Sequence, residues 1–311
     1  MNPEKEYARM GKRSITNSVS LPAEVIIHII TAAFVICCIL PFIFIIIISF
    51  TEESSLSSIG YSFFPQAWSA EAYDSLFKVG RPLWLSFFNS IVITVIGTGL
   101  SVLVCIMYSY GMFRRDYPYR KFFTFIAFFT MMFGGGLAPT VMVCRALGLN
   151  NNYAALIIPA LVSPFNFIVM RTFFKTSISE SLIESAALDG SGEFNTLFKI
   201  VVPIAKPGIA TIALLNALAY WNDWYLALLY VDVRDMYPLQ YFLMQMQNNI
   251  EFLKRNAAIM GGGVAMEALA EMPSESLRMA LCVFIVVPIA FAYPFFQRYI
   301  VAGLTIGAVK E

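Results

Sequence analysis

A short polar and aromatic cluster interrupts one of the long apolar runs of the sequence. The run 208–231 contains this cluster, which consists of Tyr220, Trp221, Asn222, Asp223 and Trp224. A carboxylate near the middle of a bilayer costs roughly 2.5–3.5 kcal/mol, so Asp223 should face the protein interior or water. Aromatic faces can cover the apolar side of a sugar ring, while amides and carboxylates bind hydroxyl groups. The cluster therefore predicts contacts along a path for a carbohydrate.

Asn166 and Phe167, in another apolar run, are predicted to contact the same path. A structural interpretation is open for both groups. In that interpretation, Asn166 and Asp223 form hydrogen bonds between helices, and the aromatic residues lie at the outer membrane interface.

The rest of the sequence offers no catalytic constellation. It has no Ser-His-Asp set, no carboxylate pair in a predicted cleft and no Cys/His cluster with the spacing of metal ligands. Its five cysteines lie in or beside apolar runs, where we interpret them as free thiols. No G-x-x-x-x-G-K-[ST] motif is present. We therefore expect a non-catalytic chain without metal or cofactor, and any ATP must be bound by another chain.

The longest polar interruption near the middle of the chain is the segment 176–207. Its first half predicts a short helix, because Ser177 and Glu180 have capping-box spacing. Apolar residues recur every four positions at Ile178, Leu182 and Ala186. Gly190 should end this helix, because glycine adopts the left-handed conformation at little cost.

A second short helix is predicted in the other half of this segment. Its apolar residues have helical spacing and are Phe194, Leu197, Phe198 and Val201. Pro203 and Pro207 mark its end. The segment therefore predicts a helix, a glycine turn and a second helix that lie across one face of a membrane.

The composition identifies the class of protein. Of 311 residues, 59% are hydrophobic and only 13% are charged, whereas soluble domains have about 25% charged residues. The net charge of +1 gives no indication of nucleic-acid binding. The chain is therefore predicted to be an all-α membrane protein.

Six apolar segments are long enough to cross a bilayer, which takes about 20 residues. The first is expected to be a membrane anchor, because it is too long for a signal peptide. Gly134–Gly136 and Pro139 predict a kink in the third segment. A surface helix is expected within 67–78, and 232–275, with glycines at 261–263, is expected to be a polar loop. The predicted spans are 25–50, 83–113, 122–143, 154–174, 208–231 and 277–301.

The basic residues predict the orientation of these spans. If both termini, the turn 114–121 and the central segment lie on one side, that side holds 14 of the 21 basic residues. The positive-inside rule makes it cytoplasmic. The arginines of the turn are interpreted as topology determinants.

The central segment also resembles a known motif. Glu184-Ser185-Ala186, Asp189-Gly190, Ile200 and Pro203 are similar to the EAA loop of binding-protein-dependent ABC importer permeases. Ser185 is the one departure, because the pattern has an alanine at this position; serine is also small. In that family the loop docks into a groove on the ATPase subunit. The resemblance thus implies a coupling role for Glu184, Ser185, Ala186, Ala187, Asp189, Gly190, Ile200 and Pro203.

The resemblance extends over residues 25–310. It points to the carbohydrate-uptake branch, specifically the second membrane subunit of maltose-type importers in the complex-oligosaccharide subgroup. The residues that carry it are Asn89-Ser90, Gly135-Gly136-Leu137, Pro139, Leu147-Gly148-Leu149, Pro159, Asn166, Trp221-Asn222-Asp223, Gln297-Arg298-Tyr299, Gly303, Gly307 and Lys310.

This resemblance implies a type I permease fold with six transmembrane helices and cytoplasmic termini. The implied divisions are an N-terminal segment (1–24), the first helix with its outer loop (25–82), the core permease domain (83–304, with coupling loop 176–207) and a tail (305–311). The implied location is the bacterial cytoplasmic (inner) membrane, with the chain multi-pass.

The implied partners are a second permease subunit, two copies of an ABC ATPase that binds ATP and Mg²⁺, and an extracytoplasmic solute-binding lipoprotein. The implied substrate is a carbohydrate, and in that subgroup an oligosaccharide. Two alternatives stay open at this point: a permease for another solute such as peptides, and an ion-coupled carrier or channel.

Overall fold

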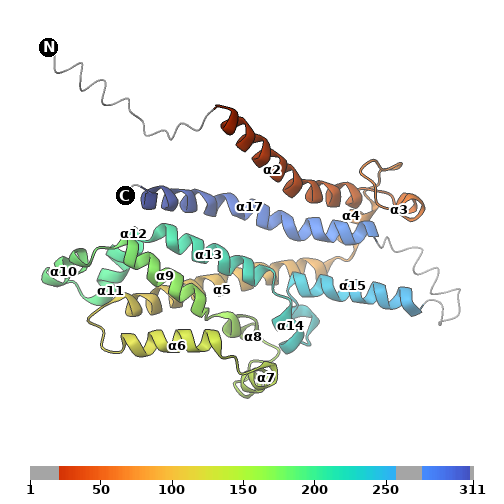
Figure 1. Cartoon of the computed structure of the whole chain (residues 1–311). Helices are drawn as coiled ribbons and strands as arrows, with labels where there is room; N and C mark the ends of the chain where they lie inside the picture. Colours follow the sequence, from red (N-terminus) through yellow and green to blue (C-terminus); the bar gives the residue numbers. More distant parts are fainter. Residues whose placement is uncertain (1–20, 257–274, 309–311) are drawn as a thin grey trace, which may run out of the picture.

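The computed structural model describes residues 21–256 and 275–308. Every element in these two ranges is helical, apart from a single antiparallel bridge between Thr51 and Trp68. The predictions that concern residues 1–20, the glycines at 261–263 and Lys310 fall outside the described residues. The all-helical prediction is confirmed for the described part. Most of the longer helices lie roughly along one common direction, and α2 is oblique to them (Figure 1).

The first predicted apolar helix is confirmed as α2 (Leu21–Ser49), whose C-terminal part packs against the last helix while the rest diverges from it (Figure 1). Most of its apolar side chains are exposed. Two short helices follow at one end, α3 (Glu53–Ile59) and α4 (Glu71–Lys78). The surface helix predicted within 67–78 is therefore present as α4.

The central helix is α5 (Arg81–Phe113), which agrees with the predicted span 83–113. It packs against α9 and α13. Gly97 permits the close approach of α13, because a Cβ atom there would lie 2.7 Å from the Tyr220 ring. The core of the molecule thus lies around α5.

The third predicted span is divided in two. α6 (Arg120–Met132) ends before a glycine-rich break, and α7 (Leu137–Ala146) begins after it. Gly136 adopts a φ of +85°, which L side chains rarely adopt. The predicted interruption is confirmed, and it separates two helices.

The prediction of one continuous fourth helix is wrong. α8 (Ala154–Ile157) and a 3₁₀ turn (Ile158–Ala160) precede α9 (Pro164–Ser177), and the two parts are bent by 54°. Pro159 and Pro164 explain the break because neither has an N–H group for helical hydrogen bonding.

The central segment forms α10 (Glu180–Leu188), α11 (Glu193–Thr196), a π-helical turn (Leu197–Val201) and α12 (Val202–Ile204). The helical part Glu193–Ile204 meets α13 (Lys206–Trp221) at 85°. These elements gather at one end of the molecule (Figure 1).

The fifth predicted span, 208–231, is also interrupted. α13 ends at Trp221, and α14 (Tyr225–Tyr230) begins after a three-residue break. A 3₁₀ turn (Arg234–Met236) and α15 (Leu239–Asn256) follow. The prediction of a polar loop over 232–275 is therefore wrong for the part that forms α15, whose buried Leu239 and Leu243 have helical spacing.

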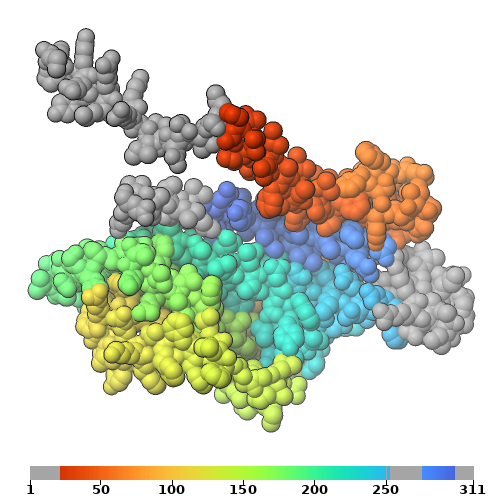
Figure 2. All heavy atoms as spheres, in the orientation of Figure 1, coloured from red at the N-terminus to blue at the C-terminus, as the bar shows by residue number. Residues whose placement is uncertain are grey.

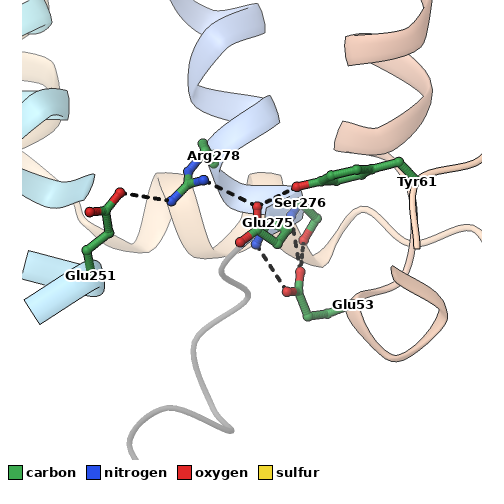
Figure 3. A network of polar contacts seen from close by, with 6 residues as sticks. All are labelled: Glu53, Tyr61, Glu251, Glu275, Ser276 and Arg278. Atoms are coloured by element: carbon green, nitrogen blue, oxygen red, sulfur yellow. Dashed lines mark hydrogen bonds and ion pairs between the residues drawn. The ribbon is translucent and has the colours of Figure 1, made fainter. Parts of the chain in front are cut away.

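The last helix, α17 (Glu275–Ala308), extends beyond the predicted 277–301. Figure 3 shows a polar network at its first turn. The Glu53 carboxylate accepts hydrogen bonds from the backbone N–H of Glu275 (3.1 Å) and from the N–H and hydroxyl of Ser276 (3.1 and 2.8 Å). A carboxylate at a helix N-terminus is favourable because it pairs with free N–H groups and the helix dipole. It also fastens α3 to α17.

Two further side chains extend this network. The Tyr61 hydroxyl donates to Glu275 at 2.7 Å. Arg278 lies 3.5 Å from Glu275 and 3.6 Å from Glu251 of α15. The segment after α2, α15 and α17 are therefore held together at the end opposite α10–α12 (Figures 1 and 3).

Three of the described helical segments are long and apolar enough to cross a membrane singly: Pro22–Ser49, Arg81–Phe113 and Glu275–Gln297. Counting each bent helix pair as one span gives up to five. α6, with 13 residues, is shorter than the about 20 residues that a single crossing needs.

We predict that Gly97→Ala destabilises the fold by roughly 1–3 kcal/mol, the usual range for overpacking. The added methyl group would displace the Tyr220 ring, whose hydroxyl donates to the Ile157 carbonyl at 3.0 Å and shares a 3.1 Å hydrogen bond with Ser101. The measurement is the thermal unfolding midpoint of the purified protein in detergent.

Gly99→Ala is the matched control, because a Cβ atom at Gly99 meets no atom within 4 Å. It should keep or raise the midpoint, since alanine favours a helix over glycine by about 1 kcal/mol. Equal midpoints for the two variants would contradict the proposed close contact between α5 and α13.

Candidate functional site

The first candidate site is the segment α10–α12, and its first helix begins differently from the prediction. Ser177 is the last residue of α9, and Ser179 precedes α10, with no hydrogen bond from its side chain to the helix. The Ser177–Glu180 capping box is therefore wrong. The cause is Ile178, which is buried in an extended conformation and separates the two helices.

The buried side of α10 is formed by Ile183 and Ala186, whereas the predicted Leu182 is exposed. The predicted stop at Gly190 is confirmed, with a φ of +79°. Its N–H donates to the Ala187 carbonyl (3.0 Å), and the Ser191 N–H donates to the Ala186 carbonyl (2.9 Å). This pair of bonds is a Schellman cap, which depends on a left-handed residue at position 190.

The second half of the segment is helical but irregular. Leu197 and Val201 are buried as predicted, whereas Phe194 and Phe198 are exposed. The π-helical turn lies just before Pro203, which has no N–H to donate to the Lys199 carbonyl.

Among the residues matched to the EAA motif, Ala186 is buried and Ile200 is half-buried. The others are exposed, and they are Glu184, Ser185, Ala187, Asp189, Gly190 and Pro203. Two apolar residues that the sequence analysis did not select are also exposed beside Gly190: Leu188 at 89% and Phe194 at 68%. We call Glu184, Ala187, Leu188, Asp189 and Phe194 the α10–α12 surface.

Two arginines that follow α5 hold this segment from both sides. Arg115 pairs with Glu180 of α10 at 2.7 Å, and Arg114 pairs with Glu193 of α11 at 2.9 Å. We call these four residues the arginine clamp. The Tyr110 hydroxyl also donates to Glu193, at 2.7 Å. The turn that was interpreted as a topology determinant therefore also positions α10 and α11.

The two pairs of the arginine clamp differ in exposure. The Arg114 side chain is 13% exposed and that of Arg115 is 71% exposed. Arg114 also bonds Asp116, and this hydrogen bond lowers the pKa of the Asp116 carboxyl below its usual value. An exposed ion pair contributes about 0–1 kcal/mol, so the Arg114 pair is the stronger constraint.

The second candidate site comprises the predicted path residues on α9 and α13. Asn166 donates from its side-chain amide to the Asn216 side-chain oxygen at 2.9 Å, and both residues are buried. The sequence analysis did not select Asn216. Phe167 is buried and stacks on Tyr108, with ring centroids 4.4 Å apart.

Tyr220 and Trp221 are also buried and make contacts between helices. Tyr220 bonds the end of α8 through the Ile157 carbonyl. The Trp221 indole N–H donates to the Ile285 carbonyl of α17 at 3.3 Å. The structure thus brings Asn166, Tyr220 and Trp221 into internal hydrogen bonds, and contact with a substrate stays a prediction.

The remaining three path residues form the break between α13 and α14. One Asp223 carboxylate oxygen accepts from the N–H groups of Tyr225 (2.8 Å) and Leu226 (3.1 Å) and thereby caps α14. Asn222 accepts from Gln240 of α15 at 3.2 Å, and Trp224 is 41% exposed. These side chains are more accessible than the buried pair Tyr220 and Trp221.

No family model matches the sequence, but individual proteins do. The polygalacturonan/rhamnogalacturonan transport system permease protein YtcP of Bacillus subtilis (strain 168) is 34% identical over 287 residues, which cover 92% of this chain and 98% of that protein. Protein LplC of the same organism is 35% identical over 273 residues, or 88% of this chain and 89% of that protein.

A solved structure has a similar fold. It is described as a bacterial ABC transporter involved in the import of the acidic polysaccharide alginate. The match has a TM-score of 0.75 and 28% identity, and it covers 91% of this chain and 99% of that chain. The sequence identity over almost the whole chain and the shared fold together show that this protein belongs to the permease subunits of carbohydrate ABC importers.

Proposed function

We propose that this permease forms half of a translocation path for an oligosaccharide and couples it to a separate ATPase through the α10–α12 surface. The observation that carries the coupling role is the exposed apolar pair Leu188 and Phe194 beside the capped turn at Gly190. The helical part Glu193–Ile204 stands at 85° to α13, which suits a surface element that receives a partner and transmits its movement to a span.

The proposed topology has six crossings with both termini in the cytoplasm of a bacterium, in the inner membrane. In this arrangement α6, the glycine-rich break and α7 together provide the third crossing. The basic turn after α5 and the α10–α12 surface lie at the same end of the molecule, which supports a cytoplasmic position for both (Figure 1). The proposed parts of the chain are the N-terminal segment 1–24, the first helix with its outer loop at 25–82, the core permease domain 83–304 and the tail 305–311.

The proposed assembly contains a second permease subunit, two ABC ATPase copies that bind ATP and Mg²⁺, and an extracytoplasmic solute-binding protein. The missing nucleotide-binding motif supports a separate ATPase. The exposed apolar side chains of α2 need a covering of lipid or of the second permease.

The proposed substrate is an oligosaccharide, supported by the polysaccharides named in the descriptions of two similar proteins. The proposed path contacts are the amides of Asn166 and Asn216 together with Phe167, Tyr220, Trp221, Asn222, Asp223 and Trp224. Within this set, Trp224 is the aromatic residue with the best access, at 41% exposure.

We predict that Gly190→Val abolishes uptake and weakens co-purification of the ATPase. Valine in the left-handed conformation costs roughly 1–2 kcal/mol, so the cap and the shape of the α10–α12 surface should change. Gly192→Val is the matched control, because Gly192 has a φ of −70° and open space around it. Wild-type uptake and ATPase recovery with Gly190→Val would contradict the coupling role.

We predict that Glu193→Gln lowers sugar uptake per ATP hydrolysed several-fold, while the ATPase still co-purifies. The change removes the charge that holds α11 on the mostly buried Arg114. Glu180→Gln removes the equivalent charge opposite the exposed Arg115 and should have little effect. The measurement is sugar uptake per ATP hydrolysed in proteoliposomes. Equal values of this ratio in both variants would show that the arginine clamp does not transmit movement.

We predict that Trp224→Ala raises the sugar concentration needed for half-maximal uptake by roughly tenfold, which corresponds to about 1.4 kcal/mol of lost contact. Trp68→Ala is the control, because Trp68 is exposed near α3 and outside the proposed path. If the two variants transport with the same apparent affinity, Trp224 is not a substrate contact and its role is structural.

A further inference from the structure

A basic cavity of about 700 Å³ lies between the start of α6 and the end of α9. Four cationic side chains line it, from the turn after α5, from α6 and from α9: Arg115, Arg120, Lys121 and Arg171. We propose that this cavity binds the phosphate headgroup of an anionic phospholipid, with the acyl chains lying along α6.

The first support for this proposal is an excess of positive charge. Arg115 pairs with Glu180, whereas within the described ranges no carboxylate lies within ion-pair distance of Arg120, Lys121 or Arg171. Arg120 and Lys121 lie in the first turn of α6, where the helix dipole adds positive potential. An anion in the cavity would therefore meet three uncompensated cations and the positive end of a helix.

The second support is an apolar wall of the same cavity, formed by α6. Phe125 and Phe128 line it one to two turns beyond Arg120, and they are 63% and 44% exposed. The exposed apolar surface of α6 continues through Phe129 and Met132. Figure 2 shows α6, in yellow, at the outer surface of the molecule. A cavity lined by cationic side chains and by an exposed apolar wall fits an amphiphile better than a soluble phosphate ester.

The convergence of the charges distinguishes this cavity from ordinary topology determinants. Positive-inside orientation needs only basic residues near the ends of spans. Here, half-buried arginines from two helices, Arg120 and Arg171, line one cavity. By contrast, Lys175 and Lys206 are exposed in the same part of the chain and do not line it. Basic cavities between helices on the cytoplasmic side are a known form of anionic-lipid site.

The test measures lipid bound to the full importer, purified from phosphatidylcholine membranes with and without phosphatidylglycerol. Native mass spectrometry counts the retained lipids. The Arg120→Gln/Arg171→Gln variant is expected to retain roughly tenfold less phosphatidylglycerol than the unaltered importer. The Lys175→Gln/Lys206→Gln variant changes the net charge equally and should retain it, as should Arg120→Lys/Arg171→Lys. Equal loss in both glutamine variants would overturn the proposal.

Two further measurements identify the molecule bound in the cavity even if a glutamine variant assembles poorly. A photo-reactive benzoylphenylalanine at position 128 should crosslink to lipid, whereas a crosslink only to another protein subunit would overturn the proposal. Inorganic phosphate should not displace the retained lipid; displacement at millimolar phosphate would show a soluble-anion site instead. The lipid measurement needs no transport, so a failure of the proposed coupling role would leave its outcome readable.

Discussion

Backbone amides and carbonyls inside a bilayer must find partners within the protein, and this requirement governs where the chain can interrupt its helices. At the break after α8, the Tyr220 hydroxyl donates to the Ile157 carbonyl. At the break after α13, the Asp223 carboxylate accepts from the N–H groups of Tyr225 and Leu226. Two residues that have the chemistry of sugar recognition therefore also complete the backbone hydrogen bonding, which explains why polar groups are tolerated at these positions.

α5 connects these breaks to both ends of the molecule. At one end, Arg114 holds α11 through Glu193. In the middle, Gly97 lets the Tyr220 ring pack directly on the helix.

At the other end of α5, Asn89 donates to the Asp235 carbonyl at 2.8 Å, and the Ser90 hydroxyl accepts from the Leu239 N–H at 2.7 Å, so α15 is also fixed to α5. A displacement of the α10–α12 surface can thus reach the opposite end of the molecule through one continuous helix.

The sequence predicted the features that depend on local composition, and these are confirmed: the long apolar helices α2 and α5, the glycine-rich interruption before α7 and the stop at Gly190. The family resemblance, which relied on spaced motif residues, is confirmed as well.

Features set by long-range packing were not predicted or were predicted wrongly. The Ser177 capping box failed because Ile178 is buried between two helices, and the Arg114–Glu193 pair joins segments with no local sequence relationship. The role of the path residues could not be read from residue type, because Asn166 pairs with Asn216 from another helix.

The α10–α12 surface is proposed to be the contact between this permease and a separate ATPase. Hydrogen–deuterium exchange of the permease, with and without the ATPase in the same detergent, tests it most directly. We predict that peptides covering 184–198 become protected from exchange when the ATPase is present, and that those covering α15 change little. Unchanged exchange over 184–198, with protection elsewhere on the chain, would contradict it.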